Sequence, residues 1–117
     1  MNIETILTHY VGCALWSSVD DQQEPLDADH DISDIAPATL AQMRADVSSF
    51  VTTNAKTLTQ AGLDDGQIGH DFWLTRNHHG AGFWDRGLGE LGDRLAKAAN
   101  ACGEVDLYVG DDGRVYQ

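Results

Sequence analysis

The residues best suited to chemistry lie in one segment, His70–Arg86, with the sequence HDFWLTRNHHGAGFWDR. It holds two of the three Trp, three of the five His and two of the seven basic residues of the chain. Imidazole and guanidinium groups can transfer protons, ligate metal ions or bind anions. The candidate ligand-binding residues are His70, Arg76, His78, His79 and Arg86.

A metal site is one interpretation of this segment, since imidazole is a common ligand of zinc and other late transition metals. However, the adjacent His78 and His79 point in different directions on a strand or loop. The segment also has no HxH or HExxH pattern and no neighbouring cysteine pair. We therefore predict no metal site and no cofactor.

Two further interpretations concern anions and proton transfer. The Gly80–Gly82 loop precedes a predicted helix and could present backbone N–H groups to a phosphate, although Asp85 would repel an anion there. The spacing is neither that of a Walker loop nor that of a dinucleotide-binding loop. General acid–base catalysis by His70 or His78, oriented by a neighbouring carboxylate, lacks a paired nucleophile. We assign no catalytic residue.

A structural role explains the same segment more fully. Phe72, Trp73, Phe83 and Trp84 are large enough to dominate a small core. Arg76 and Arg86, two of the candidate ligand-binding residues, could instead pair with nearby acids and stack on the indole rings. The sequence favours this interpretation, which leaves room for a binding role at the edge of the segment.

Negative charge is the second strong signal. Nineteen acidic residues against seven basic ones give a net charge of −12 and a pI near 4.4. Seven of the acids lie in a stretch without a single basic residue, and they are Asp20, Asp21, Glu24, Asp27, Asp29, Asp31 and Asp34. Such a chain repels nucleic acid and anionic lipid and is attracted to basic surfaces. We predict that these seven residues bind a basic surface of a partner protein; the alternative is that they only keep the protein dispersed.

Hydropathy patterns divide the chain into elements. Asn2–Ser17, Pro37–Ala61 and Asp85–Asn100 show the stripes of amphipathic helices. Gln67–Arg76 alternates like a strand, and Glu104–Tyr116 is typical of a hairpin. We therefore predict one α+β domain over residues 1–117, ordered α-α-β-α-β-β, with helices on one face of a three-stranded antiparallel sheet.

The remaining features concern compartment. No apolar run reaches the length of a membrane span, and the N-terminus lacks the basic region of a signal peptide. Cys13 and Cys102 are distant and form no CxxC pair, so we expect two buried thiols, with a disulfide between them as the alternative.

The segments DFWLTRNHHGAGFWDRGLGELGDRL, GEVDLYVGDDGRVY and EPLDADHDISDIAPATLAQMRADV resemble small acidic proteins encoded by bacteriophages, plasmids and other mobile elements. The likeness covers most of the chain and is weakest before Trp16. That group has no established activity, so it assigns no catalytic or binding residue. It implies a bacterial cytoplasm and an accessory gene of a mobile element.

This context suggests a function. Mobile elements encode small acidic proteins that block restriction or CRISPR machinery, often by occupying a nucleic-acid-binding groove as DNA mimics. We therefore expect a protein-binding accessory factor of that anti-CRISPR or antirestriction type. One alternative is a small enzyme or a nucleotide- or phosphate-binding domain that uses the His70–Arg86 segment. Another is an assembly protein that dimerises through exposed aromatic residues.

Overall fold

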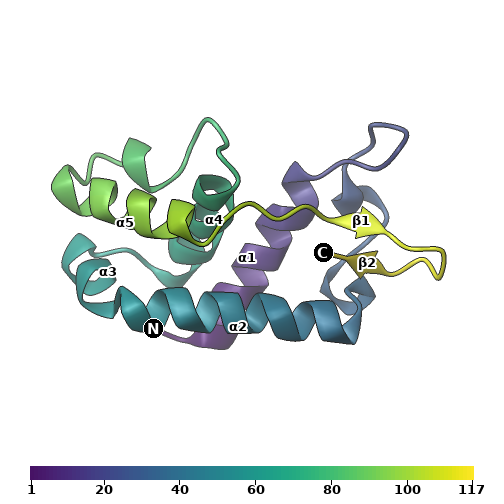
Figure 1. Ribbon diagram of the computed structural model, residues 1–117, viewed down its shortest axis with the longest axis horizontal. Coiled ribbons are helices and arrows are strands. Elements are labelled where there is room, and N and C mark those ends of the chain that lie inside the picture. Colours follow the sequence, from purple (N-terminus) through teal and green to yellow (C-terminus); the bar gives the residue numbers. More distant parts are fainter.

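Nearly all the regular structure of the chain is helical in the computed structural model, which describes residues 1–117. The α-helices are α1 (Ile3–Ser17), α2 (Pro37–Thr53), α3 (Ala55–Ala61), α4 (Asp65–Arg76) and α5 (Glu90–Ala101). The shorter elements are the 3-10 turns η1 (Leu26–Ala28), η2 (Ile32–Asp34) and η3 (Phe83–Asp85), and the strands β1 (Tyr108–Val109) and β2 (Val115–Tyr116). The molecule measures 43 by 25 by 21 Å, with α3 and α5 at one end of the long axis and the β1–β2 hairpin at the other (Figure 1).

α1 packs against α4 and α2, whereas α5 packs against α4 and α3. α1 begins where the sequence predicts, because the side chain of Asn2 accepts a hydrogen bond of 3.0 Å from the backbone N–H of Thr5. α4 lies directly against it. A Cβ atom added to Gly69 would clash with the carbonyl oxygen of Ile6 and lie 2.8 Å from the backbone nitrogen of Tyr10. The two helix backbones therefore touch at a point where only glycine fits.

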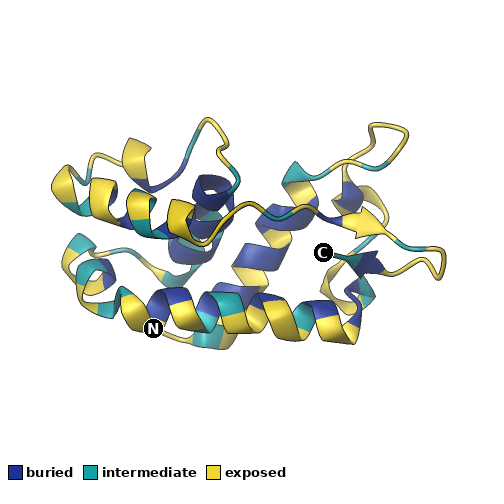
Figure 2. Cartoon of the chain, viewed as in Figure 1, coloured by how far each residue is buried: buried dark blue, intermediate teal, exposed yellow.

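Aromatic side chains of α4 fill the space between α1 and α2. The ring of Phe72 stacks on that of Phe50 from α2, with centroids 4.2 Å apart, and Tyr10 packs against the same ring. The indole N–H of Trp73 donates a hydrogen bond of 2.7 Å to Ser17 Oγ, so this buried ring leaves no unpaired polar atom. Figure 2 shows these inward helix faces as buried. The expected aromatic core is confirmed for Phe72, Trp73 and Phe83, whereas Trp84 is exposed.

The hairpin is joined to the acidic segment that precedes α2. Tyr108 faces Tyr116, and Val109 faces Val115, in antiparallel register. Val115 is fully buried and also forms a parallel bridge with Ile35. The hairpin and the 18–36 segment therefore occupy the same end of the molecule (Figure 1).

The predicted fold class is wrong, because Gln67–Arg76 belongs to helix α4 and the sheet has two strands instead of three. Asp64 accepts a hydrogen bond of 2.7 Å from the backbone N–H of Gln67 and so caps a helix where the sequence predicts a strand. Ile68, Gly69 and every residue from Asp71 to Arg76 are buried, and His70 between them is partly buried. A helix enclosed on nearly every side carries no one-sided stripe, and its apolar residues can imitate strand alternation.

Two predicted helix boundaries also need correction. The second predicted helix breaks at Asn54 into α2 and α3 before it ends at Gly62, as expected. The third begins at Glu90 instead of Asp85, because Gly87 and Gly89 adopt positive φ angles of 70° and 59°.

Both cysteines are free, so the alternative of a disulfide is not observed. Cys13 is buried as predicted, but Cys102 follows the end of α5 and is exposed. No helix combines the length and the apolar character that crossing a bilayer requires.

We predict that Gly69→Ala destabilises the protein by about 1–3 kcal/mol, because the added methyl group forces α1 and α4 apart. Gly12→Ala in α1 is the matched control, since a Cβ atom added there would meet no atom within 4 Å outside its chain neighbours and its own helix backbone. That control should stabilise the protein by about 0.5–1 kcal/mol through helix propensity. Urea unfolding of both variants checks the contrast, and equal stability of the two would contradict the close helix contact.

Candidate functional site

Arg76, one of the candidate ligand-binding residues, is buried and fully engaged inside the protein. Its Nη1 donates to Tyr10 Oη at 3.0 Å and to Asp46 Oδ2 at 2.9 Å. Its Nε donates to the carbonyl oxygen of Gly103 at 2.8 Å, and Nη2 donates to that of Cys102 at 3.0 Å. One side chain from α4 thus joins α1, α2 and the end of α5. Every nitrogen of the guanidinium group is occupied by an internal partner, which leaves little for an external anion.

The electrostatics of this cluster agree with a structural role. Burial raises the pKa of Tyr10 to about 12, so its hydroxyl remains protonated. Burial by itself would lower the pKa of Arg76, but its interactions with Tyr10 and Asp46 outweigh that effect and raise it. The guanidinium ion therefore stays charged, with Asp46 as its counter-ion.

Arg86 forms the second internal ion pair. Its Nε and Nη2 donate to the two carboxylate oxygens of Asp71 at 3.0 and 2.7 Å. The side chain of Asp71 is completely buried, and that of Arg86 is 31% exposed. This bidentate pair neutralises a carboxylate that would otherwise be buried without compensation. The hydrogen bond to Asp71 raises the pKa of Arg86.

The three candidate histidines lie in different surroundings. His70 projects from α4 with its ring centroid 6.3 Å from that of Trp16. His78 has a positive φ of 57°, and its Nε2 lies 3.2 Å from a carboxylate oxygen of Glu104. His79 lines a hollow of about 310 Å³ beside the chain segment that follows α5. No hollow contains two of the three, and no group of His, Cys, Asp and Glu residues is arranged to hold a metal ion.

The glycine-rich loop does not lead into a long helix. It enters η3, a single turn, and the backbone N–H of Phe83 donates to Thr75 Oγ1 at 3.1 Å. A Cβ atom at Gly82 would clash with that same hydroxyl. The loop glycine therefore serves close packing against α4.

The acidic segment folds as a series of capped turns. Asp20 Oδ1 accepts from the backbone N–H groups of Gln22 and Glu24, at 2.8 and 3.0 Å. Asp31 and Asp34 cap η2 reciprocally, each accepting a backbone hydrogen bond. The buried side chains of Leu26 and Ile35 anchor the segment to the body. Three of its seven acids thus stabilise local structure as well as carrying charge.

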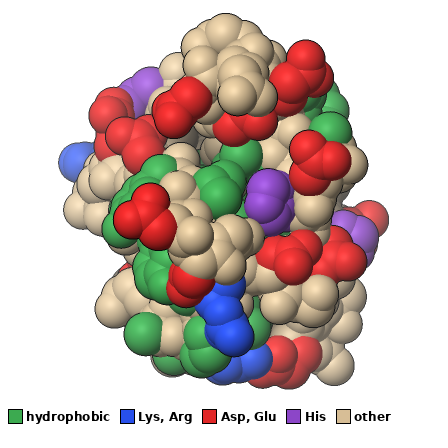
Figure 3. Space-filling view, turned by 90° about the vertical axis from the view of Figure 1, so that its right-hand side faces the viewer, with side chains coloured by type: hydrophobic (Ala, Val, Ile, Leu, Met, Phe, Trp, Pro, Cys, Tyr) green, Lys and Arg blue, Asp and Glu red, His purple; other side chains and the backbone are tan.

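None of these seven carboxylates takes part in an ion pair. Asp21, Glu24, Asp27, Asp29 and Asp31 are exposed, while Asp20 and Asp34 are partly buried. The hairpin turn adds Asp111 and Asp112, also exposed, to the same end of the molecule, together with one exposed base, Arg114. Figure 3, which views this end, shows acidic side chains spread over the face and few basic ones. We call this surface, the seven acids together with Asp111 and Asp112, the acidic end.

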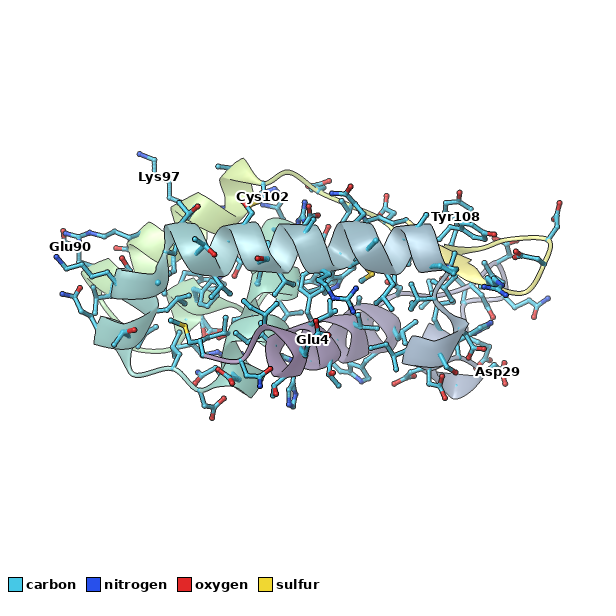
Figure 4. All side chains as sticks on the ribbon, turned by 90° about the horizontal axis from the view of Figure 1, so that it is seen from below. Glu4, Asp29, Glu90, Lys97, Cys102 and Tyr108 are labelled. Atoms are coloured by element: carbon cyan, nitrogen blue, oxygen red, sulfur yellow. The ribbon has the colours of Figure 1, made fainter.

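Exposed apolar side chains lie beside the acidic end. Tyr108 is 57% exposed and stacks on Tyr116, with ring centroids 5.7 Å apart. Val19 and Val109 are also exposed, and with Tyr108 they line a small hollow that Asp20 and Asp21 border. This cluster was not among the predicted sites, although alternation in the predicted hairpin places Tyr108 on the face opposite to the buried Leu107. Figure 4 places Tyr108 and Asp29 at the same end of the molecule, and Glu90 at the other.

The structural role of Arg76 is testable. We expect Arg76→Met to destabilise the protein by about 3–5 kcal/mol, because Asp46 and two carbonyl groups lose their buried donor. Arg76→Lys should recover only part of this loss, since an ammonium group cannot reproduce the planar fork. Arg94→Met removes an exposed pair with Glu90 and should change stability little. Chemical denaturation measures all three, and a fully stable Arg76→Met variant would refute the role.

The two thiols should differ in reactivity. Burial raises the pKa of Cys13 to about 12 and shields its sulfur, whereas Cys102 is accessible although burial also raises its pKa. At mildly alkaline pH a disulfide reagent should therefore modify one thiol in the native protein and both after denaturation. The native reaction should vanish in Cys102→Ser and persist in Cys13→Ser; any other pattern would contradict the assigned burial.

Comparison of the chain with protein-family models, with curated proteins and with solved structures finds no match.

Proposed function

We propose that this protein is a protein-binding accessory factor that uses its acidic end to engage a basic surface of another protein. The observation that carries the proposal is the set of seven neighbouring carboxylates without a single ion-pair partner. Elsewhere in the chain, arginines form ion pairs with other acids, among them Asp46, Asp71 and Glu4. Other acids without an ion-pair partner are dispersed along the chain, namely Asp64, Asp65, Asp85, Asp93 and Asp106, whereas the seven acids lie together within residues 20–34. The acidic end is therefore the densest group of carboxylates left for an external partner.

Such a surface favours fast association and selects partners by charge. Uncompensated charge at one end steers a basic protein toward it and accelerates encounter at low ionic strength. The exposed Tyr108, with Val19 and Val109 beside it, supplies apolar area that charge alone does not provide. Aromatic residues surrounded by polar groups often dominate binding energy at interfaces.

The partner class follows from the same chemistry. Carboxylates displayed on a surface can occupy a site that otherwise binds phosphates, so we propose a nucleic-acid-binding partner. In the mobile-element setting that the resemblance implies, the protein would inhibit a host defence of the restriction or CRISPR type. The alternative of a small enzyme or nucleotide-binding domain has less support, because Arg76 and Arg86 are engaged by Asp46 and Asp71.

The test compares two variants with equal changes in net charge. Asp21→Asn/Asp27→Asn/Asp29→Asn neutralises exposed acids of the acidic end that cap no turn. Asp85→Asn/Glu90→Gln/Asp93→Asn neutralises exposed acids near and within α5, at the opposite end. Each tagged protein is used to capture proteins from a bacterial lysate at low and high salt, with heparin as a polyanionic competitor.

We expect the wild type and the α5 control to retain the same basic, nucleic-acid-binding protein, and heparin or high salt to release it. The variant of the acidic end should lose it while unfolding at an unchanged temperature. Retention by that variant with the same salt dependence would disprove the proposal.

A further inference from the structure

The outer face of α1 is hollowed on both sides of Gly12. One hollow, of about 280 Å³, lies toward α4 and is bordered by Trp16 and His70. The other, of about 340 Å³, lies toward η1 and η2 and is bordered by Asp27 and Ile32. Thr8 and Gly12 line both, so the two hollows adjoin across the helix. In Figure 4 α1 runs along one side of the molecule with side chains projecting away from the body.

Gly12 has no reason inside the molecule to be glycine. It lies in the interior of a regular helix, has no positive φ, and an added Cβ would have no atom within 4 Å apart from those of its chain neighbours and its own helix backbone. Gly69 and Gly92 differ, because a Cβ at either position would run into backbone. Glycine is unfavourable within helices, and an open one exposes the helix backbone to close approach from outside. The position is therefore suited to contact with another chain.

The two hollows differ in chemistry. Toward α4 the wall is aromatic, with Trp16 60% exposed and its ring near that of His70. This side suits a large apolar side chain. Toward η1 and η2 the floor is largely apolar, His30 also lines the hollow, and the carboxylates of Asp27 and Asp31 stand at the border. That combination suits lysine or arginine, whose aliphatic stem lies on apolar surface while the cation stays near carboxylates and water.

We infer that this groove binds a basic, amphipathic segment of the protein partner, which crosses α1 at Gly12. An apolar side chain of the segment packs against Trp16, and a lysine or arginine reaches Asp27 and Asp31. The inference rests on the proposed function, since those two acids belong to the acidic end. A second copy of this chain fits poorly, because each copy carries a net charge of −12 and no lysine or arginine borders either hollow.

The probe is a synthetic peptide of leucine and lysine, about 18 residues long and patterned as an amphipathic helix. A peptide with glutamate in place of lysine is its control. Binding is measured at physiological salt in a Trp84→Phe background, where Trp16 is the exposed indole, because Trp73 is buried. We expect the lysine peptide to shift the Trp16 emission to shorter wavelength and the glutamate peptide to have no effect.

The decisive variant is Gly12→Gln, which fills the point where the hollows meet. It should weaken binding of the lysine peptide by about tenfold or more, while helix α1 remains at least as stable. Ala45→Gln, on an exposed position of α2, makes a similar surface change elsewhere and should leave binding unaltered. Asp27→Asn/Asp31→Asn should weaken binding, whereas Glu90→Gln/Asp93→Asn should have a much smaller effect.

Unchanged affinity of the lysine peptide for Gly12→Gln would disprove that the groove binds a basic segment. So would a lack of binding to the wild type, or a dimer formed through this face in sedimentation. These results would leave the proposed function to be judged by lysate capture with the three-acid variant. Loss of partners there, combined with normal capture by Gly12→Gln, rejects the groove and keeps the function. Retention of partners by both variants rejects both.

Discussion

The buried guanidinium group of Arg76 is the interaction on which the rest of the structure depends. It reaches the phenol of α1, a carboxylate of α2 and two carbonyl groups beyond α5, so one side chain fixes the relative positions of four segments. Its Cζ also lies 5.3 Å from the centroid of the Phe72 ring, in the centre of the aromatic core. Helices that pack only through apolar contacts can slide along one another. A polar cluster with fixed hydrogen-bond geometry holds them in one relative position. The interior is thus specified by charge as well as by apolar volume.

Local signals in the sequence are sufficient to predict a helix or strand where one face of that element is exposed to water. α1 has an apolar stripe and the Asn2 cap, so the sequence predicts it correctly. Alternation around the Gly110–Gly113 turn also predicts the hairpin, although its paired strands cover only Tyr108–Val109 and Val115–Tyr116 and not the residues from Glu104. α4 lacks such a signal because its residues are buried on nearly all sides. α1, α5 and η3 cover it, and Gly69 allows the close approach of α1, a contact that joins residues distant in the chain. Local propensity for a strand is therefore overridden by tertiary packing.

The same distinction applies to the candidate sites. The run of acids between Asp20 and Asp34 is visible in the sequence, and its lack of ion pairs agrees with the absence of nearby bases. The pairing of Arg76 with Asp46 was not predictable, because the two residues are 30 positions apart and on different helices. The pairing of Arg86 with Asp71 agrees with the prediction that Arg86 pairs with a nearby acid, since both residues lie in the segment His70–Arg86. The apolar cluster around Tyr108 and the groove at Gly12 depend on how distant segments meet.

The division of charge within the molecule has a physical consequence for its partners. Basic residues are few, and the structure commits Arg76 and Arg86 to acids in or beside the core. The carboxylates of the acidic end consequently repel one another, and the anchors Leu26 and Ile35, with the bridge from Ile35 to Val115, hold their segment to the body. A basic partner would relieve that repulsion on binding, whereas a neutral partner would not. The proposed selectivity for basic surfaces would therefore follow from where the fold places its arginines, independently of which protein supplies the surface.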